Sequence, residues 1–352
     1  MEFAFTSEQQ MIADTARSFF AENATSERTR RAMAGDGVDR ELWRGFCQDL
    51  GFSCIGLPEE LGGAGLGLVE MAIIAEAAGA QVAALPMLGS LALCAQAIAA
   101  GGSAAQQQAW LPGLISGETI AAYAHDAGLR ANGDVLNGEA GFVAHGASAG
   151  VFVVAGDHGA WLVRADAPGV KVAGLTTMDQ TRPYACVTLA SVVGEPLAQP
   201  ARAIAAAYRT GFVVVAAEAL GGAQACLDRT VVYAKERIQF GRPIGSFQAY
   251  KHRLADMMIE IEQARSAVYW AACAVDDGSE EAEIAGHAAK SFAADTYFMC
   301  AGNMIQLHGG IGFTWEHDAH LFFKRARALQ TMLGNGSWHR ERVAGMILGD
   351  VA

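Results

Sequence analysis

Apolar residues recur at helical spacing through the first third of the chain, which predicts an N-terminal helical domain over residues 1–117. Ser7 and Gln10 match the pattern of a capping box at the start of the first helix. The apolar positions that follow are Met11, Ile12, Ala16, Phe19 and Phe20. A second amphipathic helix is predicted over 41–50, ended by Gly51, and a short one over 106–114.

One stretch of this region imitates a membrane span. Glu76 is the only charged residue from Ala72 to Gly102. Pro86 and several glycines and glutamines interrupt the stretch, and no basic flank marks a cytoplasmic end. The pattern therefore predicts two buried helices joined near residues 85–86, and no membrane span.

The spacing of apolar residues shortens from the helical period toward alternation between residues 118 and 197. Short runs of β-branched and aromatic residues, bounded by Gly, Asp or Pro, are typical of strands. The clearest runs are 151–155, 160–163 and 184–189. This region is predicted to be a small, mostly antiparallel β domain.

Helical spacing returns after Pro200 and continues to the end, which predicts a C-terminal helical domain over 198–352. The helices expected there cover 201–236, 254–268, 282–307 and 340–348. Helices, then strands, then helices favour an α+β fold with segregated domains, 1–117, 118–197 and 198–352, rather than alternating βαβ units.

Composition supports a large folded interior, since 52% of the 352 residues are hydrophobic and only 18% are charged. The net charge of −12 without a basic block argues against nucleic acid and anionic membranes as partners. Seven cysteines without CxxC spacing indicate reduced thiols, and the acidic first residues lack the pattern of a signal peptide. A cytoplasmic location is therefore expected.

Two glycine-containing segments carry the candidate chemistry. Residues 236–248 join two predicted helices and include Arg237, Arg242 and Gln248. Residues 306–313 follow a helix end and place glycines at 309, 310 and 312. Glycines let backbone N–H groups approach an oxyanion, and an arginine suits a pyrophosphate. Either segment alone is more often an ordinary helix end or a solvated face.

Together, and with the start of the chain and the segment Leu57–Gly65, these motifs resemble the acyl-CoA dehydrogenase family over essentially the whole chain. The resemblance implies FAD bound across a subunit interface, and hence an oligomer. The residues it assigns to a neighbour's FAD are Arg237, Phe240, Gln248, Gln306, Gly309 and Gly310. It also implies α,β-desaturation of an acyl-CoA, with a carboxylate base, hydride transfer to the flavin, and an electron-transfer flavoprotein as acceptor.

The sequence departs from the family where the base is expected. Leu333 falls at one usual position of the glutamate, and the other falls near Thr210 and Gly211. Glu218 lies further along the same helix, and a buried, paired carboxylate is its favoured interpretation. No catalytic residue is assigned.

The loop that usually cradles the flavin ring is replaced by Tyr123–Arg130, and the following aromatic segment reads Gly141–His145. His125 or His145 could donate to a flavin, although a surface turn is the commoner place for such a histidine.

The retained residues are those given to a neighbour's flavin, whereas those for the chain's own flavin and base are missing. This chain therefore resembles the partner-type subunit of α2β2 acyl-CoA dehydrogenases from bacterial steroid side-chain degradation, with a steroid-type CoA thioester as the expected substrate. Two alternatives stay open: a homotetramer with a relocated carboxylate such as Glu218, and a catalytically dead scaffold or regulatory homologue. Helices rich in Ala and Gly leave room for a bulky acyl group, but close helix packing explains them better.

Overall fold

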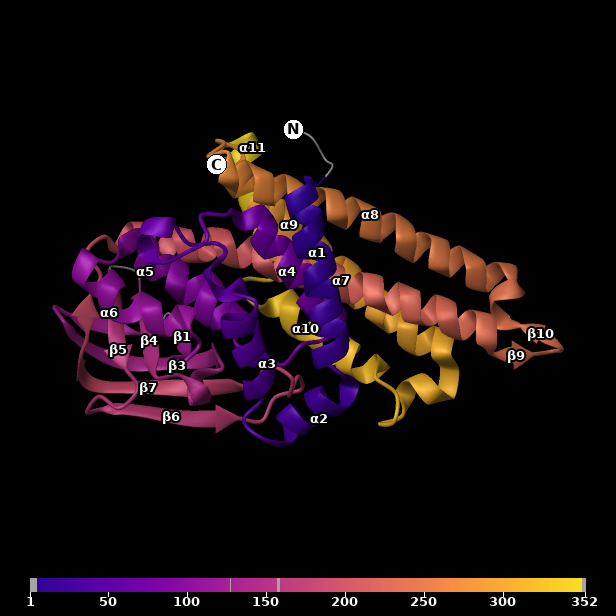
Figure 1. Ribbon diagram of the computed structural model, residues 1–352, viewed down its shortest axis with the longest axis horizontal. Coiled ribbons are helices and arrows are strands. Elements are labelled where there is room, and N and C mark those ends of the chain that lie inside the picture. The colour runs from indigo at the N-terminus through magenta and orange to yellow at the C-terminus, as the bar shows by residue number, and fades with distance from the viewer. Residues whose placement is uncertain (1–4, 127, 157–158, 350–352) are drawn as a thin grey trace. The chain divides into compact units, whose positions relative to one another are not determined.

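The computed structural model describes residues 5–126, 128–156 and 159–349. Helices come first, two β-sheets follow and helices complete the chain, which confirms the predicted α+β class (Figure 1). Contacts group the chain into two compact units. One comprises Met1–Ser26, Met71–Ala83 and Phe212–Ala352, and the other comprises Glu27–Glu70 and Ala84–Gly211. The domain limits at residues 117 and 197 stay a prediction.

The N-terminal helices agree with the predicted pattern except in their details. They are α1 (Ser7–Asn23), α2 (Ser26–Ala34), α3 (Arg40–Arg44), α4 (Leu68–Ala80), α5 (Gln96–Gly101) and α6 (Ala104–Ile115). The capping box at α1 is formed by Thr6 and Gln9, one residue earlier than predicted, because the polar run at this point fits both registers. The helix expected over 41–50 is α3 followed by a π-helix, Gly45–Asp49, and a second π-helix, Leu88–Ala95, precedes α5.

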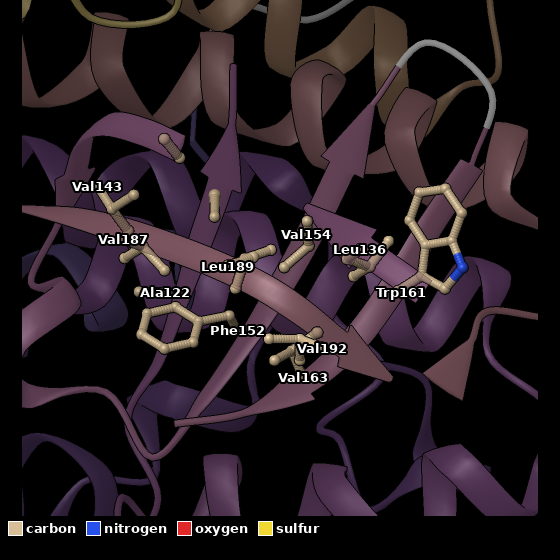
Figure 2. Close-up of a cluster of buried hydrophobic side chains, with 12 residues drawn as sticks. Ala122, Leu136, Val143, Phe152, Val154, Trp161, Val163, Val187, Leu189 and Val192 are labelled. Atoms are coloured by element: carbon tan, nitrogen blue, oxygen red, sulfur yellow. The ribbon is translucent and has the colours of Figure 1, made fainter. Parts of the chain in front are cut away.

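The middle of the chain forms two four-stranded sheets, in the orders β1-β4-β5-β8 and β2-β3-β7-β6. The strands are β1 (Ala121–His125), β2 (Arg130–Asn132), β3 (Val135–Ala144), β4 (Val151–Gly156), β5 (Gly159–Arg164), β6 (Val170–Leu175), β7 (Tyr184–Val193) and β8 (Glu195–Pro196). Every pairing except the parallel β1–β4 pair is antiparallel, as predicted. Figure 2 shows the buried cluster between them, in which Phe152 and Trp161 are the largest side chains.

The C-terminal part contains α7 (Pro200–Glu236), α8 (Gln248–Asp276), α9 (Ala282–His308), α10 (Ala319–Thr331) and α11 (Gly336–Leu348). A short hairpin of β9 (Ile238–Gln239) and β10 (Arg242–Pro243) joins α7 to α8. Within the described residues, α7 alone is long and apolar enough to cross a membrane, but 72% of its apolar window is buried inside the protein. Its apolar composition is therefore that of a core helix.

Small residues bring α4 and α7 into direct backbone contact. A Cβ atom added to Gly221 would lie 1.8 Å from the carbonyl oxygen of Glu76, and one added to Gly79 would lie 2.1 Å from that of Glu218. Such approaches are possible only without a side chain. The glycines therefore serve close helix packing here and leave no space for a ligand.

Gly221→Ala is accordingly expected to lower the free energy of unfolding by about 2–3 kcal/mol, because the two helices must separate. Gly302→Ala is the matched control, since Gly302 lies inside α9 and an added Cβ meets nothing within 4 Å. That substitution should stabilise the protein by about 0.5–1 kcal/mol. Urea unfolding of both variants measures the difference. Equal effects would mean that the α4–α7 contact relaxes at no cost.

Candidate functional site

The two glycine-containing motifs lie at one end of the bundle formed by α7, α8 and α9. The hydroxyl of Tyr233, on α7, donates to the carbonyl oxygen of His308 at 3.3 Å. The hydroxyl of Tyr250, on α8, donates to the carbonyl oxygen of Leu307 at 3.0 Å. The last carbonyls of a helix have no partner within it, so these tyrosines satisfy the end of α9. They also fix that end against the helices that carry the hairpin.

The hairpin presents Phe240 to solvent at its tip. Phe240 and Gly241 have φ values of 52° and 73°, so both central residues of the two-residue turn lie in the left-handed region. This turn normally carries Asn-Gly or Asp-Gly, and a phenylalanine there is strained. The Phe240 side chain is nevertheless 92% exposed. A strained and exposed aromatic residue is a candidate for contact with another molecule.

The charged residues of the hairpin are exposed as well. Arg237 follows α7 directly, and its backbone is fixed by bonds to the Tyr233 carbonyl and from the Ile244 amide, both 2.9 Å. Its side chain is exposed. The Arg242 guanidinium lies 4.1 Å from the centre of the Phe247 ring. Gln248 is the first residue of α8 and is exposed.

The second motif forms an open turn. Gly309 has a φ of 64° and ends α9, and a Cβ atom added to Gly309 or Gly310 would meet nothing within 4 Å. Gln306, one turn earlier, is exposed. A ligand can therefore approach this backbone without a side chain in its way. The structure thus brings Arg237, Phe240, Gln248 and the glycine motif to the same end of the bundle.

His308 supports the turn from inside. Its Nδ1–H donates to the carbonyl oxygen of Met304 at 2.7 Å, and its ring stacks on that of Tyr233 with centroids 4.4 Å apart. Burial lowers the pKa of His308, which favours the neutral imidazole. Sequence reasoning assigned no role to Tyr233, Tyr250 or His308. Tyr233 and Tyr250 lie on either side of the first motif and His308 lies within the second, and these positions are the only signal that the sequence offers for them.

Glu218 is the buried, paired carboxylate that was expected. The Arg325 guanidinium, on α10, donates to its Oε1 at 2.5 Å, and the two side chains are 2% and 3% exposed. An ion-paired carboxylate of this kind is held by its partner and is a poor proton acceptor. The geometry therefore argues against Glu218 as a relocated base.

The loop at the family's glutamate position is firmly held in a conformation of its own. Leu333 has a φ of 54° and lies between α10 and α11. The buried Lys290 ammonium donates to the carbonyl oxygens of Gln330, at 3.1 Å, and of Gly334. Burial lowers the pKa of Lys290 to about 8. This lysine has a structural role in the loop, and residues 331–337 themselves contain no carboxylate.

The two histidines near the expected flavin ring differ in their surroundings. His125 ends β1, and its Nδ1 lies 3.2 Å from the carbonyl oxygen of Ala155. His145 is only 1% exposed and has a φ of 55°, so the expectation of a surface turn is wrong for this residue. Its backbone N–H binds the carbonyl oxygen of Pro183 at 2.8 Å, which draws the turn inward. Phe142, the aromatic residue of the segment Gly141–His145, lies on β3 and is 77% exposed.

A cleft of about 1020 Å³ lies elsewhere, between α1, α4, α7 and α8. Glu76 lies in its wall and accepts hydrogen bonds from Arg265 and Tyr269, both at 2.6 Å. Arg229, also in the wall, binds Asp318 and Gln81. These charged groups already satisfy one another, so the cleft adds nothing to the site at the end of the bundle.

Comparisons with known proteins support the family resemblance that the motifs indicate. The acyl-CoA dehydrogenase N-terminal domain model matches residues 6–118, and the C-terminal domain model matches residues 204–348. Acyl-CoA dehydrogenase IpdE2 of Mycobacterium tuberculosis is 38% identical over 93% of each chain. The structure resembles a chain of the ChsE4-ChsE5 complex of M. tuberculosis (TM-score 0.93, 30% identity), covering 100% of both chains. It also resembles the Tcur3481-Tcur3483 steroid ACAD (TM-score 0.87, 32% identity), covering 97% of this chain and 98% of that chain. The chain belongs to the acyl-CoA dehydrogenase family, and is thus an oxidoreductase of that kind.

Proposed function

We propose that this chain is one subunit of a heteromeric, FAD-dependent acyl-CoA dehydrogenase that introduces an α,β double bond into an acyl-CoA thioester. The proposal rests on a difference between the residues that would bind the cofactor and the positions where the base is expected. Groups suited to a neighbour's cofactor gather, exposed, at the end of the bundle, whereas neither usual position of the base holds a carboxylate.

The exposed end of the bundle fits the outer part of an FAD molecule. Arg237 would bind the pyrophosphate through charge-assisted hydrogen bonds. Gly309 and Gly310 would allow close approach of the adenine end, beside Gln306. Phe240 and Gln248 would line the same site. The tyrosine hydroxyls that fix the end of α9 hold these groups ready before a ligand arrives, which lowers the entropic cost of binding.

Because this chain lacks a base, the partner subunit must supply the group that removes the proton. When bound, the flavin supplies the hydride acceptor of the desaturation. Removal of the α-proton needs a carboxylate beside the substrate. Leu333 and Gly211 cannot accept a proton, and Glu218 is held by Arg325. The base therefore comes from the homologous partner subunit in an α2β2 assembly, and the electrons leave to an electron-transfer flavoprotein.

The names of similar solved structures support both a heteromeric assembly and a steroid-type substrate. Two of the similar solved structures carry paired subunit names, ChsE4-ChsE5 and Tcur3481-Tcur3483, and the second is described as a steroid ACAD. A steroid-type CoA thioester is therefore the proposed substrate class.

Flavin stoichiometry tests this function most directly. The chain would be purified alone and as a complex with a co-expressed homologous acyl-CoA dehydrogenase subunit, and flavin absorbance would be compared with protein concentration. We expect the chain alone to be colourless and the complex to hold one FAD per two chains. Oxidation of an acyl-CoA with a steroid side chain by the complex, but by neither subunit alone, completes the test.

Two results would contradict the proposal. One FAD bound per chain in the isolated protein, with acyl-CoA oxidation, would indicate a self-sufficient homotetramer. A complex that forms without flavin or turnover would indicate a scaffold or regulatory homologue.

A further inference from the structure

Two buried histidines join α9 to α11. Nδ1 of His287, on α9, lies 2.7 Å from Nδ1 of His339, on α11, which is a hydrogen-bond distance. These two residues, here called the histidine pair, are 4% and 0% exposed. Among the thirteen residues of α11, all in the described part of the chain, His339 alone is buried. The ion pair between the same helices, Arg340 with Asp295, is exposed by contrast. The histidine pair is therefore the buried centre of the contact that holds α11.

Aromatic rings enclose the histidine pair. The centre of the Phe212 ring, on α7, lies 4.9 Å from the centre of each imidazole. The Trp338 ring, on α11, lies 5.5 Å from that of His287 and 4.9 Å from that of His339. Rings of this kind exclude water and offer a cation little of the solvation that it loses on burial. The surroundings therefore favour neutral imidazoles.

Three charged side chains act on the histidine pair. Glu283, on α9, and Arg342, on α11, are exposed and shift the pKa of His287 in opposite directions. Lys290, on α9, is buried, and its ammonium group lowers the pKa of His339. Water screens the first two charges much more than the third. The strongest nearby charge is thus positive, and it disfavours a further positive charge on the pair.

These surroundings make the contact depend on pH. Burial is the largest cause of a lowered pKa in both histidines. Burial, Lys290 and His287 together lower the pKa of His339 to about 3, against an opposite effect of the backbone of Leu333 and Gly334. In an open state, in which α11 has left α9, both rings would reach water and regain the ordinary pKa of 6.5. A histidine whose pKa is lower in the closed state favours closure fully above pH 6.5, and this contribution is lost as the pH falls.

The geometry of the hydrogen bond limits the charge that the closed state can hold. A neutral imidazole carries one N–H group and an imidazolium carries two. Only one proton can lie between the two Nδ1 atoms, so one ring donates and the other accepts. If both rings were charged, two N–H groups would face each other at 2.7 Å, and repulsion would replace the bond. The histidine pair therefore holds at most one positive charge while α11 is in place.

We propose that the histidine pair is an acid-sensitive switch, which releases α11 and the preceding loop, residues 332–335, from α9 when both rings take up protons. The loop is part of the switch because it connects α10 to α11, and it carries Leu333 at the family's base position. The glycine motif follows the other end of α9, about 30 Å from His287 at 1.5 Å per residue. The switch therefore acts outside the proposed flavin contacts and does not depend on the proposed function.

Hydrogen exchange of the full chain, followed by mass spectrometry at pH 7.5 and pH 5, tests the switch. Exchange rates would first be corrected for their intrinsic dependence on pH. A single histidine that regains a pKa of 6.5 on opening makes the open state about 30-fold more populated at pH 5. Protection of residues 336–348 should therefore fall by at least about 30-fold. Residues 213–217, in the buried centre of α7, are the internal reference and should keep their protection.

Two asparagine variants separate the switch from other effects of acid. His339→Asn removes one titrating group and keeps an amide near the place of Nδ1, whose oxygen can accept from a charged His287. Its protection of α11 should fall by less than about threefold, and His287→Asn should behave alike. His252→Gln, at an exposed histidine of α8, is the matched control and should keep the wild-type fall. Each protein is compared with itself at two pH values, so a constant loss of packing cancels.

The fall in the wild type, its absence in the asparagine variants and its presence in the control would support the switch. Equal protection of wild-type α11 at the two pH values would overturn it. An equal fall in the wild type and both asparagine variants would do so as well, because groups other than the histidine pair would then cause the opening. A fall that includes residues 213–217 would indicate general unfolding in acid and would also refute a local switch.

Discussion

Replacing Arg325 by methionine is expected to lower the free energy of unfolding by about 3–5 kcal/mol, because it removes the guanidinium that binds the buried Glu218 carboxylate. Both side chains are almost fully inaccessible, so water cannot take over the lost interaction. Urea unfolding at neutral pH, monitored by far-UV circular dichroism, measures the loss. It should be the largest stability effect of any single ion-pair substitution in the described structure.

Two further variants make the result interpretable. Arg340→Met removes an ion pair with Asp295 whose side chains are 59% and 42% exposed, and should cost less than about 1 kcal/mol. Glu218→Leu combined with Arg325→Met removes both charges and should recover most of the loss, since apolar residues can replace a buried pair. A double variant as unstable as Arg325→Met alone would mean that packing, rather than the buried charge of Glu218, causes the effect.

The ion pair between Arg325 and Glu218 also determines whether Glu218 is interpreted as a structural or as a functional residue. A glutamate within an apolar run is either a paired structural residue or a functional carboxylate, and the sequence favours the first without naming its partner. The partner is 107 positions away, in a helix that the apolar pattern did not reveal. Only the tertiary fold brings the two charges together. Loss of acyl-CoA oxidation in a Glu218 variant would therefore have to be corrected for unfolded protein before a catalytic role is inferred.

Periodicity predicted most of the fold, and its failures have physical causes. The long helices and the main strands carry one apolar face each, so their spacing is visible. Helix α10 was not predicted, because Lys324, Arg325 and Arg327 interrupt its apolar residues and Arg325 lies on the buried face. The π-helices at Gly45–Asp49 and Leu88–Ala95 have i→i+5 hydrogen bonds and therefore more residues per turn than an α-helix, but they are too short for the apolar spacing to reveal the difference.

The sequence predicted the two motifs of the candidate site but not the residues that hold these motifs in place. Glycines and arginines at fixed spacing identify the two segments, because backbone access and anion binding restrict the residue types. Tyr233 and Tyr250 act through single hydroxyl–carbonyl bonds across the bundle, and any helix can carry a tyrosine. Their role depends on which helix ends meet, and this follows only from the three-dimensional arrangement.

Arg237→Met, measured in the assembled complex, is expected to weaken flavin binding by about 10- to 100-fold, since charge-assisted hydrogen bonds to a phosphate contribute about 1.5–3 kcal/mol. Arg237→Lys should recover only part of the loss, because an ammonium group lacks the planar pair of donors that the pyrophosphate would accept. The measurement is the dissociation constant of FAD, from the recovery of flavin fluorescence on dilution.

Lys251→Met is the matched control, since it removes one exposed positive charge from the first turn of α8 without touching the proposed flavin contacts. Its flavin affinity should stay within about twofold of the wild type. If Lys251→Met and Arg237→Met weaken flavin binding equally, these residues act only through the overall positive charge of this region, and Arg237 does not contact the cofactor. If Arg237→Met alone does so while the complex stays assembled, this subunit binds the cofactor through Arg237 even though it carries no base of its own.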